Sequence, residues 1–170
     1  GIKEGKKQVR RLIKEVKVPV IASIFSTRLN EIKSLSSEIA SINPPLIELN
    51  ISCPHVEDEF GKSLAMSEKT AFEATMVAKK EIGKIPLLCK ISANYSDIAK
   101  VAKACEEAGA DGISAINTVG PGMVIDIKTR KPVLGNKRGG VSGPEIRPIA
   151  VRCVYDIYAE FIFVFLAFRT

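Results

Sequence analysis

Two hydrophobic patterns alternate along the chain. Short, nearly continuous apolar runs predict buried strands over residues 18–25, 46–52, 86–92 and 112–117. Between these runs, apolar residues recur at the spacing of one face of an amphipathic helix. This spacing predicts helices over residues 3–15, 28–42, 67–82, 96–108 and 144–158. Strands that alternate with helices in this way are typical of parallel βα units, so we expect an α/β fold.

Several of the expected helix boundaries carry a local signal. Candidate N-cap residues, whose side chains can accept a hydrogen bond from the first helical turn, are Ser26 or Thr27, Ser67, and Ser96 or Asp97. Gly83 follows one helix, where glycine readily adopts the left-handed backbone that ends a helix. The last helix is expected to begin at Pro144 and to turn Ile146, Ile149, Val154 and Ile157 inward.

Residues 118–143 interrupt the alternation of strands and helices. The segment is rich in glycine and lysine, and its apolar stretches 123–127 and 132–134 flank a basic turn, which predicts a small hairpin. Beyond the last helix, residues 161–168 form one more apolar run, compatible with a further strand or with an adhesive end.

Length and composition fit one globular domain. We treat residues 1–170 as a single domain and residues 159–170 as an atypical tail. The chain is 46% hydrophobic, which is enough to fill a core. Counting the tail, about five strands are expected. An open doubly wound sheet can stop there, whereas a complete (β/α)8 barrel needs ~250 residues.

Charge and cysteine content narrow the class of function. The net charge of +6 is concentrated in residues 1–17 and 128–147 without interleaved aromatic side chains, which favours solvated surfaces over nucleic-acid binding. The four cysteines form no CxxC pair and the chain has one histidine, so we predict no metal site. Reduced thiols and the lack of a signal peptide favour the cytoplasm. The longest apolar run, residues 161–168, is too short to span a membrane.

The stretch from Asn50 to His55 carries the densest candidate chemistry. It lies where a strand is expected to end, because Pro54 lacks the N–H that a continuing strand needs. In parallel α/β folds this end of the sheet holds the active site. Cys53 can act there as a base or a nucleophile, beside the amide of Asn50 and the hydroxyl of Ser52, while His55 either tunes the thiol or is incidental. A lone cysteine is more often an inert core residue, which we expect of Cys89, Cys105 and Cys153.

Other polar residues fall at equivalent strand ends. Lys90 ends an apolar strand, so it either snorkels to the surface or points as a cation into the mouth of the sheet. Asn117 and Thr118 close the following strand. If the strands are neighbours, Asn50, Lys90 and Asn117 share one site, although each alone would be an ordinary turn residue. The glycine-rich stretch 137–144 leads into a helix and can approach a ring or a phosphate closely, or simply make turns.

Taken together, these segments resemble a known family. They are Asn50-Ile51-Ser52-Cys53-Pro54, Asn117-Thr118, residues 122–127 with 131–134, and residues 139–144 with 147–150. In their order and spacing they resemble the class 1 dihydroorotate dehydrogenases, and most closely the NAD-linked subclass in its archaeal form. The resemblance implies the central part of an FMN-binding (β/α)8 barrel, or TIM barrel, that oxidises dihydroorotate to orotate in pyrimidine biosynthesis.

The resemblance also implies a role for each site residue. Cys53 resembles the base that takes the C5 proton of the substrate while the C6 hydride passes to the flavin. Asn50 resembles an amide that contacts both substrate and flavin. Lys90 resembles a cation beside the pyrimidine end of the flavin, where a fixed positive charge stabilises the anionic reduced ring. By the same resemblance, Asn117 and Thr118 bind substrate, and Ile116 and Gly143 contact the flavin.

Partners follow from the resemblance as well. It implies a homodimer and, for the NAD-linked subclass, an electron-transfer subunit that carries FAD and a [2Fe–2S] cluster. FMN is then the cofactor of this chain, and the other two groups belong to the partner subunit.

Three departures from the family pattern leave other functions open. His55 stands where most members have a substrate-binding asparagine. A histidine at this position resembles the related dihydropyrimidine dehydrogenases, so a reductase activity of that kind is an alternative function. Ser23 stands where bacterial members often have a flavin-contacting asparagine. The chain covers about five of the eight βα units, and residues 161–168 lack the Gly-Gly loop that binds the FMN phosphate in the family. A truncated, catalytically silent barrel fragment is therefore a further hypothesis.

Overall fold

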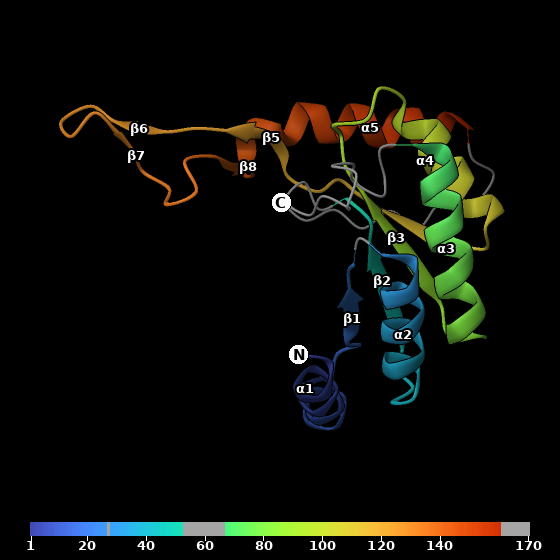
Figure 1. The fold of residues 1–170 in the computed structure, drawn as a ribbon. Helices are drawn as coiled ribbons and strands as arrows, with labels where there is room; N and C mark the ends of the chain where they lie inside the picture. Colours follow the sequence, from blue (N-terminus) through green and yellow to red (C-terminus); the bar gives the residue numbers. More distant parts are fainter. Residues whose placement is uncertain (27, 53–66, 161–170) are drawn as a thin grey trace.

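Four parallel strands form the central sheet of the protein. The computed structural model describes residues 1–26, 28–52 and 67–160. Strands β1 (Ile21–Ile24), β2 (Leu46–Asn50), β3 (Leu87–Ile91) and β4 (Gly112–Ala115) lie in the order of the chain, and each is parallel to the next (Figure 1). All four strands lie within the ranges predicted from the apolar runs. The fifth expected strand falls outside the described residues.

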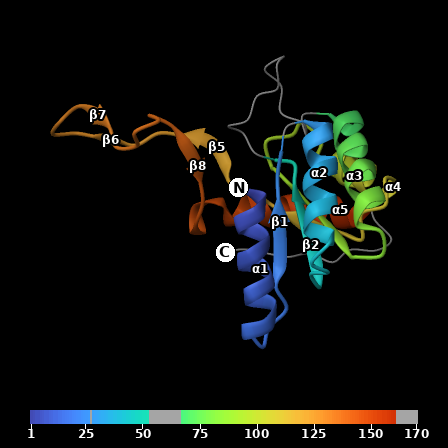
Figure 2. The same cartoon turned by 60° about the horizontal axis from the view of Figure 1, so that its bottom comes forward.

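Helices connect the strands, as the spacing of apolar residues predicts. The longer helices are α1 (Ile2–Glu15), α2 (Leu29–Ala40), α3 (Glu68–Ile82), α4 (Ile98–Glu107) and α5 (Arg147–Glu160), the last preceded by a 3-10 turn over Pro144–Ile146. Helices α2, α3 and α4 lie side by side on one face of the sheet (Figures 1 and 2). The other face of the sheet has no helical layer among the described residues.

The hydrophobic core fills the space between the sheet and this helical layer. The side chains that alternate toward the helices are at most 1% exposed, and they are Ile47, Leu49, Leu87, Ile91 and Ile113. Each such burial contributes roughly 1.5–3 kcal/mol before the entropy of ordering the chain is counted. On α3 the facing residues are Ala71, Ala74 and Ala78, all fully buried. Their short side chains let the helix lie close to the strands.

Strand β1 corrects the prediction of a fully buried strand over residues 18–25. Only Ala22 and Ile24 are buried, whereas Ile21 and Phe25 are about half exposed at 50% and 55%. The reason is topological, since β1 is the edge strand of the described sheet and helices cover one of its faces. An apolar run therefore does not separate a strand buried on both faces from one buried on a single face.

The first and last helices are also less buried than their periodicity predicts. No residue of α1 is buried, and Leu12 is 44% exposed, although the Lys6 ammonium pairs with Glu38 of α2 at 2.6 Å. On α5, which packs on α4, the buried residues are Cys153, near the middle of the helix, and Ile157. Ile149, expected to face inward, is 37% exposed, and α5 carries no buried residue before Cys153.

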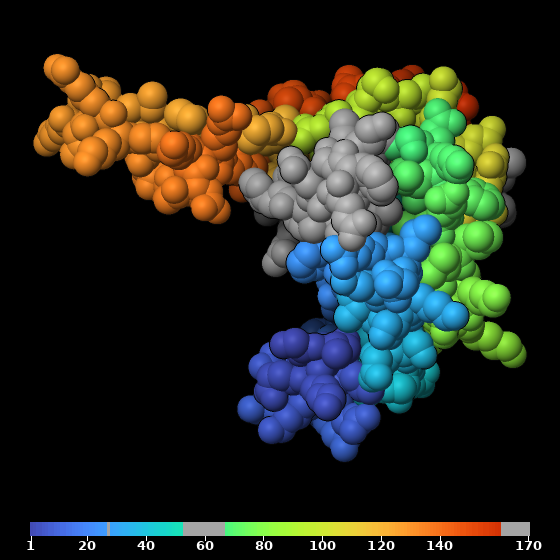
Figure 3. Space-filling model, in the orientation of Figure 1, coloured from blue at the N-terminus to red at the C-terminus, as the bar shows by residue number. Residues whose placement is uncertain are grey.

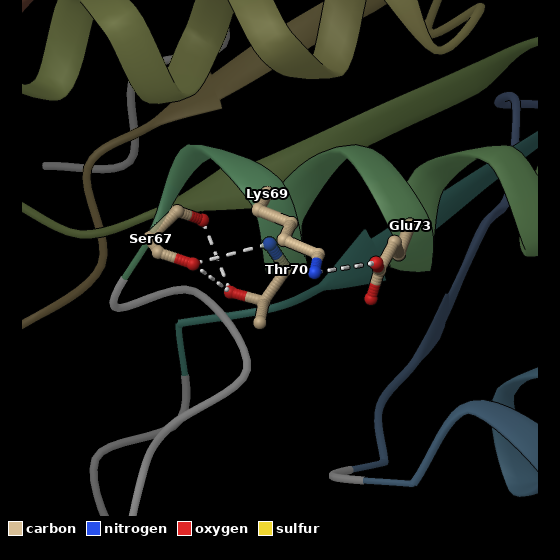
Figure 4. A network of polar contacts seen from close by, with 4 residues as sticks. All are labelled: Ser67, Lys69, Thr70 and Glu73. Carbon is tan, nitrogen blue, oxygen red and sulfur yellow. Dashed lines mark hydrogen bonds and ion pairs between the residues drawn. The ribbon is translucent and has the colours of Figure 1, made fainter.

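Helix caps were predicted correctly at two of three places. The Ser67 hydroxyl accepts the N–H of Thr70 at 3.2 Å, and α3 begins at the next residue (Figure 4). The Asp97 carboxylate caps α4 by accepting the N–H of Lys100 at 3.1 Å. The prediction for α2 was wrong, because its N-cap position is Arg28, while the Ser26 hydroxyl donates to the Glu31 carboxylate. Thr27 lies outside the described residues.

An antiparallel arm projects from the body between β4 and α5 (Figures 1 and 3). We call residues 119–141 the arm. Its tip is the predicted hairpin, in which β6 (Ile125–Asp126) pairs with β7 (Lys131–Pro132). Its base is a pairing of β5 (Val119–Gly122) with β8 (Gly139–Val141), which the sequence analysis did not anticipate.

Candidate active site

Polar side chains line the carboxyl ends of the central strands. In the register of the sheet, Asn50 of β2 lies beside Lys90 of β3, and Lys90 lies beside Ser114 of β4. Residues in register point to the same face, here the face opposite the helical layer, since the flanking Leu49, Cys89 and Ile113 are buried among the helices. The structure thus brings together strand ends that the sequence suggested were equivalent.

Asn50, Ser52 and Asn117 form one hydrogen-bonded network at this edge. The Ser52 hydroxyl donates to Asn50 Oδ1 at 2.9 Å and accepts from Asn117 Nδ2 at 2.7 Å. The backbone N–H of Ser52 also donates to Asn50 Oδ1, at 3.1 Å. Asn117 itself is held next to β3 because its N–H donates to the Ile91 carbonyl at 2.9 Å. Two of the predicted amides are therefore parts of a single polar cluster.

A hollow of about 460 Å³ opens beside this cluster. It lies between the ends of β3 and β4 and the segment that joins the arm to α5. Its lining residues are Lys90, Ile116, Asn117, Thr118, Ser142, Gly143 and Ile146. Among the described residues, those assigned by resemblance to the substrate or the flavin either line this hollow or, in the case of Asn50, lie within 3.4 Å of Asn117 Nδ2.

Lys90 brings a positive charge to the wall of the hollow. Its neighbours in the strand, Cys89 and Ile91, are fully buried, whereas Lys90 is partly exposed. Within the described ranges, no ion pair involves its ammonium group. A cation held at the end of an apolar strand attracts an anionic or electron-rich ligand more strongly than it would in open water.

The arm is attached to the site at its base. The Asn94 carboxamide, which follows β3, donates to the Gly120 carbonyl at 2.7 Å and accepts the Gly120 N–H at 3.3 Å. On the opposite strand of the arm, Gly140 lies against Thr118, so that a side-chain carbon at position 140 would overlap the Thr118 hydroxyl. The glycine-rich segment was expected to approach a ring or a phosphate closely, and in the structure Gly140 approaches Thr118 closely. The sequence did not identify this contact.

The predicted base and its neighbour, Cys53 and His55, lie outside the described residues. The last described residue before Cys53 is Ser52, which is 4% exposed. Ser23, the other departure from the family pattern, is exposed on β1, and its hydroxyl donates to Glu48 Oε1 at 2.8 Å.

The remaining cysteines are buried free thiols, as predicted for core residues. Cys89 Sγ lies 3.2 Å from the Thr75 hydroxyl under the sheet. Its hydrogen bond with Cys105 and its burial raise the pKa of the Cys89 thiol well above the ordinary range. Burial likewise raises the pKa of Cys153. The thiols of Cys89 and Cys153 are therefore protonated at neutral pH, whereas the hydrogen bond with Cys89 lowers the pKa of Cys105. None of the three lines the hollow.

Sequence reasoning missed several contributors to the site. Ser142 lines the hollow, but it lies in an irregular segment where no periodicity indicates the direction of a side chain. Ile146 also lines it, although the sequence predicts only that this residue faces inward from the last helix. The Ser52 hydroxyl was named from the sequence as a neighbour of Cys53 but was assigned no role. Its position two residues after Asn50 in the motif was the available signal, because a serine there can bond back to the amide.

The described site suits a planar ligand with hydrogen-bonding edges. Amide and hydroxyl groups stand at one side, a cation stands at another, and Ile116 and Ile146 supply apolar surface. No group of three or more His, Cys, Asp and Glu side chains gathers as a metal site in the part of the chain that the structure describes. No helix in those same ranges is long and apolar enough to cross a lipid bilayer.

Comparison with known families gives a match along almost the whole chain. The profile of the family described as "Dihydroorotate dehydrogenase" matches residues 1–163. Among individual relatives, the chain is 40% identical over 158 residues to "Dihydroorotate dehydrogenase B (NAD(+)), catalytic subunit" of Methanothermobacter thermautotrophicus, covering 93% of this chain and 51% of the relative. It is 45% identical over 152 residues to the protein of the same name from Brachyspira hyodysenteriae, covering 86% and 49%. The chain therefore spans about half the length of these relatives.

Solved structures resemble the chain in fold. Two crystal structures of phosphonopyruvate hydrolase match with TM-scores of 0.52 and 0.55, at 16% and 14% sequence identity. They cover 69% and 71% of this chain, and 43% of each hydrolase chain is matched. At such low identity the likeness concerns the fold alone, which is TIM-barrel-like. The expected class, parallel βα units of an incomplete TIM barrel, is thereby confirmed.

Proposed function

The chain belongs to the dihydroorotate dehydrogenase family, and from that membership we propose that its protein oxidises dihydroorotate to orotate with FMN as cofactor. The observation that carries the proposal is that Lys90, Asn117 and Thr118, from two strand ends, line one hollow, and that Asn50, from a third strand end, contacts Asn117 at 3.4 Å. These are the positions that the sequence motifs mark, and chemistry in parallel α/β barrels takes place at this edge.

The described residues fit the ring of a flavin. The hollow lies within the usual size range of small-molecule sites. Lys90 offers a cation, Ile116 and Gly143 offer backbone and apolar surface, and the amides of Asn50 and Asn117 offer hydrogen bonds. When bound, FMN would supply the acceptor for the hydride that leaves C6 of the substrate.

The chain's own groups then have separate tasks. Asn50, Asn117 and Thr118 hold the pyrimidine edge of the substrate through hydrogen bonds. Cys53, as a thiolate, takes the proton from C5, so the electron pair of that C–H bond forms the C5=C6 double bond as the hydride departs. Lys90 lowers the cost of the negative charge that accumulates next to it.

The partners and cellular location belong to the same proposal. The names of the relatives include "NAD(+)" and "catalytic subunit", which supports a second, electron-transfer subunit. The FAD and [2Fe–2S] cluster on that subunit, and a homodimer of the catalytic chain, are proposed from the family resemblance. The free thiols Cys89, Cys105 and Cys153 support a reducing compartment, which we take to be the cytoplasm.

The absorbance spectrum of the purified protein tests the cofactor. We expect the yellow spectrum of oxidised flavin, and we expect anaerobic dihydroorotate to bleach it. Bleaching by dihydrouracil in place of dihydroorotate would favour the dihydropyrimidine dehydrogenase-like alternative, to which His55 points. A colourless protein that is inert to both compounds would instead identify a silent barrel fragment.

The role of Cys53 is tested by Cys53→Ala. The variant is expected to bind FMN as well as the wild type does, because the thiol serves as a base and not as a flavin ligand. Loss of a general base lowers kcat by ~10²–10⁴-fold. Flavin content measured by absorbance and turnover measured with dihydroorotate check both parts. Undiminished turnover would remove Cys53 from the mechanism.

A further inference from the structure

Ser52 joins the two carboxamides of the site. Its side chain is 4% exposed, and its hydroxyl lies 2.9 Å from Asn50 Oδ1 and 2.7 Å from Asn117 Nδ2. Asn50 is its near neighbour on β2, whereas Asn117 lies 65 positions away along the chain. We propose that Ser52 is a positioning residue that fixes which end of each carboxamide faces the ligand. The identity of that ligand rests on the function proposed above.

Backbone donors determine the direction of every bond in this network. The N–H of Ser52 can only donate, so the atom of Asn50 that faces it at 3.1 Å must be the oxygen. Likewise the N–H of Thr118 lies 2.8 Å from the Asn117 side chain and requires its oxygen there. The amide nitrogen of Asn117 consequently points toward Ser52.

A hydroxyl is the group that satisfies both neighbours at once. It faces an oxygen on Asn50 and an NH2 group on Asn117, so it must donate to the first and accept from the second. A hydroxyl performs both tasks with one atom, whereas alanine performs neither. With its oxygen occupied by Ser52, Asn50 is left to present its NH2 group to a ligand.

Loss of the hydroxyl would remove the bond that joins the two side chains and leave each of them held mainly by a backbone donor. Asn117 would keep the backbone bond from Thr118, at 2.8 Å, and its longer contact with Asn50 Oδ1, at 3.4 Å, and Asn50 would keep the backbone bond from Ser52. Each carboxamide would then be held less firmly, and a ligand would have to restrict its motion on binding. Two hydrogen bonds of ordinary net strength correspond to about a ten-fold loss of affinity.

Ser52→Ala and Ser52→Thr are the test variants, and Ser36→Ala is the matched control. Threonine keeps a hydroxyl that can donate and accept. Ser36 is also fully buried, on α2, but its hydroxyl has no hydrogen-bond partner among the described residues. Ser36→Ala therefore removes a buried serine hydroxyl that holds nothing in place.

The first measurement is the exchange of side-chain NH2 protons with water, followed by NMR on the protein labelled with 15N-asparagine. In Ser52→Ala we expect the Asn117 NH2 protons to exchange at least about ten-fold faster than in the wild type. The Asn94 carboxamide, bonded to Gly120 instead, serves as an internal reference and is expected not to change.

The second measurement is calorimetric titration of the FMN-loaded protein with orotate. We expect Kd to rise about ten-fold in Ser52→Ala, to return most of the way in Ser52→Thr, and to stay at the wild-type value in Ser36→Ala. A serine with a purely structural role would lower the melting temperature but leave the Kd of the folded protein unchanged.

The two measurements separate the possible failures. Wild-type exchange and wild-type Kd in Ser52→Ala would overturn the positioning role while leaving the proposed function intact. A wild-type protein that does not bind orotate would refute the proposed function, and the NH2 exchange of Asn117 would still decide whether Ser52 orients the network.

Discussion

At the scale of single residues, alternation along a strand decides what each side chain can do. Lys90 lies between Cys89 and Ile91, which are both fully buried against the helices. Because successive side chains of a strand point to opposite faces, the lysine points instead toward the hollow. A charge in an apolar sequence is therefore accommodated without being buried in the core.

Thiol reactivity is a prediction at this scale. With the folded protein and iodoacetamide near neutral pH, we expect Cys53 to be alkylated and Cys89, Cys105 and Cys153 to be protected. The latter three are fully buried, and the raised pKa of Cys89 and of Cys153 reduces the thiolate that reacts. In denaturant all four cysteines are expected to react. Peptide mass spectrometry identifies the modified positions, with Cys53→Ala as control.

The same pKa shifts give the sign of a pH effect. Unfolded thiols ionise near pH ~8.5, whereas Cys89 and Cys153 keep their protons in the folded state at that pH. At these two thiols the unfolded state therefore binds fewer protons, so their contribution to stability is expected to fall as pH rises above that value. The pKa of Cys105, lowered by its hydrogen bond with Cys89, acts in the opposite direction. Alkylation of Cys89 in the folded protein at neutral pH would contradict both expectations.

At the scale of elements, the cap of α3 gives a stability prediction. Ser67→Ala removes the hydroxyl that accepts the Thr70 N–H, and with it the contact to the Thr70 hydroxyl at 2.9 Å (Figure 4). The free energy of unfolding is expected to fall by about 1 kcal/mol. Urea unfolding measures the change. Ser67→Asn, which keeps a capping oxygen, is expected to stay close to the wild type, and an equal loss in both variants would argue against the cap.

The contact between the arm and the site gives a second prediction for an element. Gly140→Ala places a carbon where the Thr118 hydroxyl lies, so either β8 or Thr118 must move. We expect a stability loss of about 1–3 kcal/mol and weaker binding of orotate. Gly135→Ala is the matched control, because a side-chain carbon there meets no atom within 4 Å. Urea unfolding and orotate titration compare the two variants, and equal behaviour would show that the contact carries no consequence.

Local patterns predicted the elements well and their burial less well. The apolar runs located β1 to β4, and Ser67 and Gly83 marked both ends of α3, because these signals act within a few residues. The exposure of Ile21 and Ile149 could not be predicted, since it depends on which other elements cover a face. The pairing of β5 with β8 joins distant segments whose sequences, rich in glycine, carry no alternation.

At the scale of the whole molecule, the parallel sheet turns separate motifs into one site. The resemblance marked Asn50, Lys90, Asn117 and Thr118 one by one, and the register of β2, β3 and β4 brings them to one edge. What the motifs could not supply is the bonding among them. The role of Ser52 as a bridge depends on a partner 65 positions away, and no local pattern encodes that distance.

The in-register row of Asn50, Lys90 and Ser114 also sets the spacing between polar groups on this face of the sheet. Neighbouring strands lie ~4.8 Å apart, so the row offers a polar group at that interval across the width of a ligand. A one-residue shift in the register of a strand is consequently more damaging to this row than a single substitution within it. Deleting one residue within β3 would turn the ammonium group toward the helices and place an apolar side chain in its position, whereas Lys90→Ala would only remove one polar group from the row.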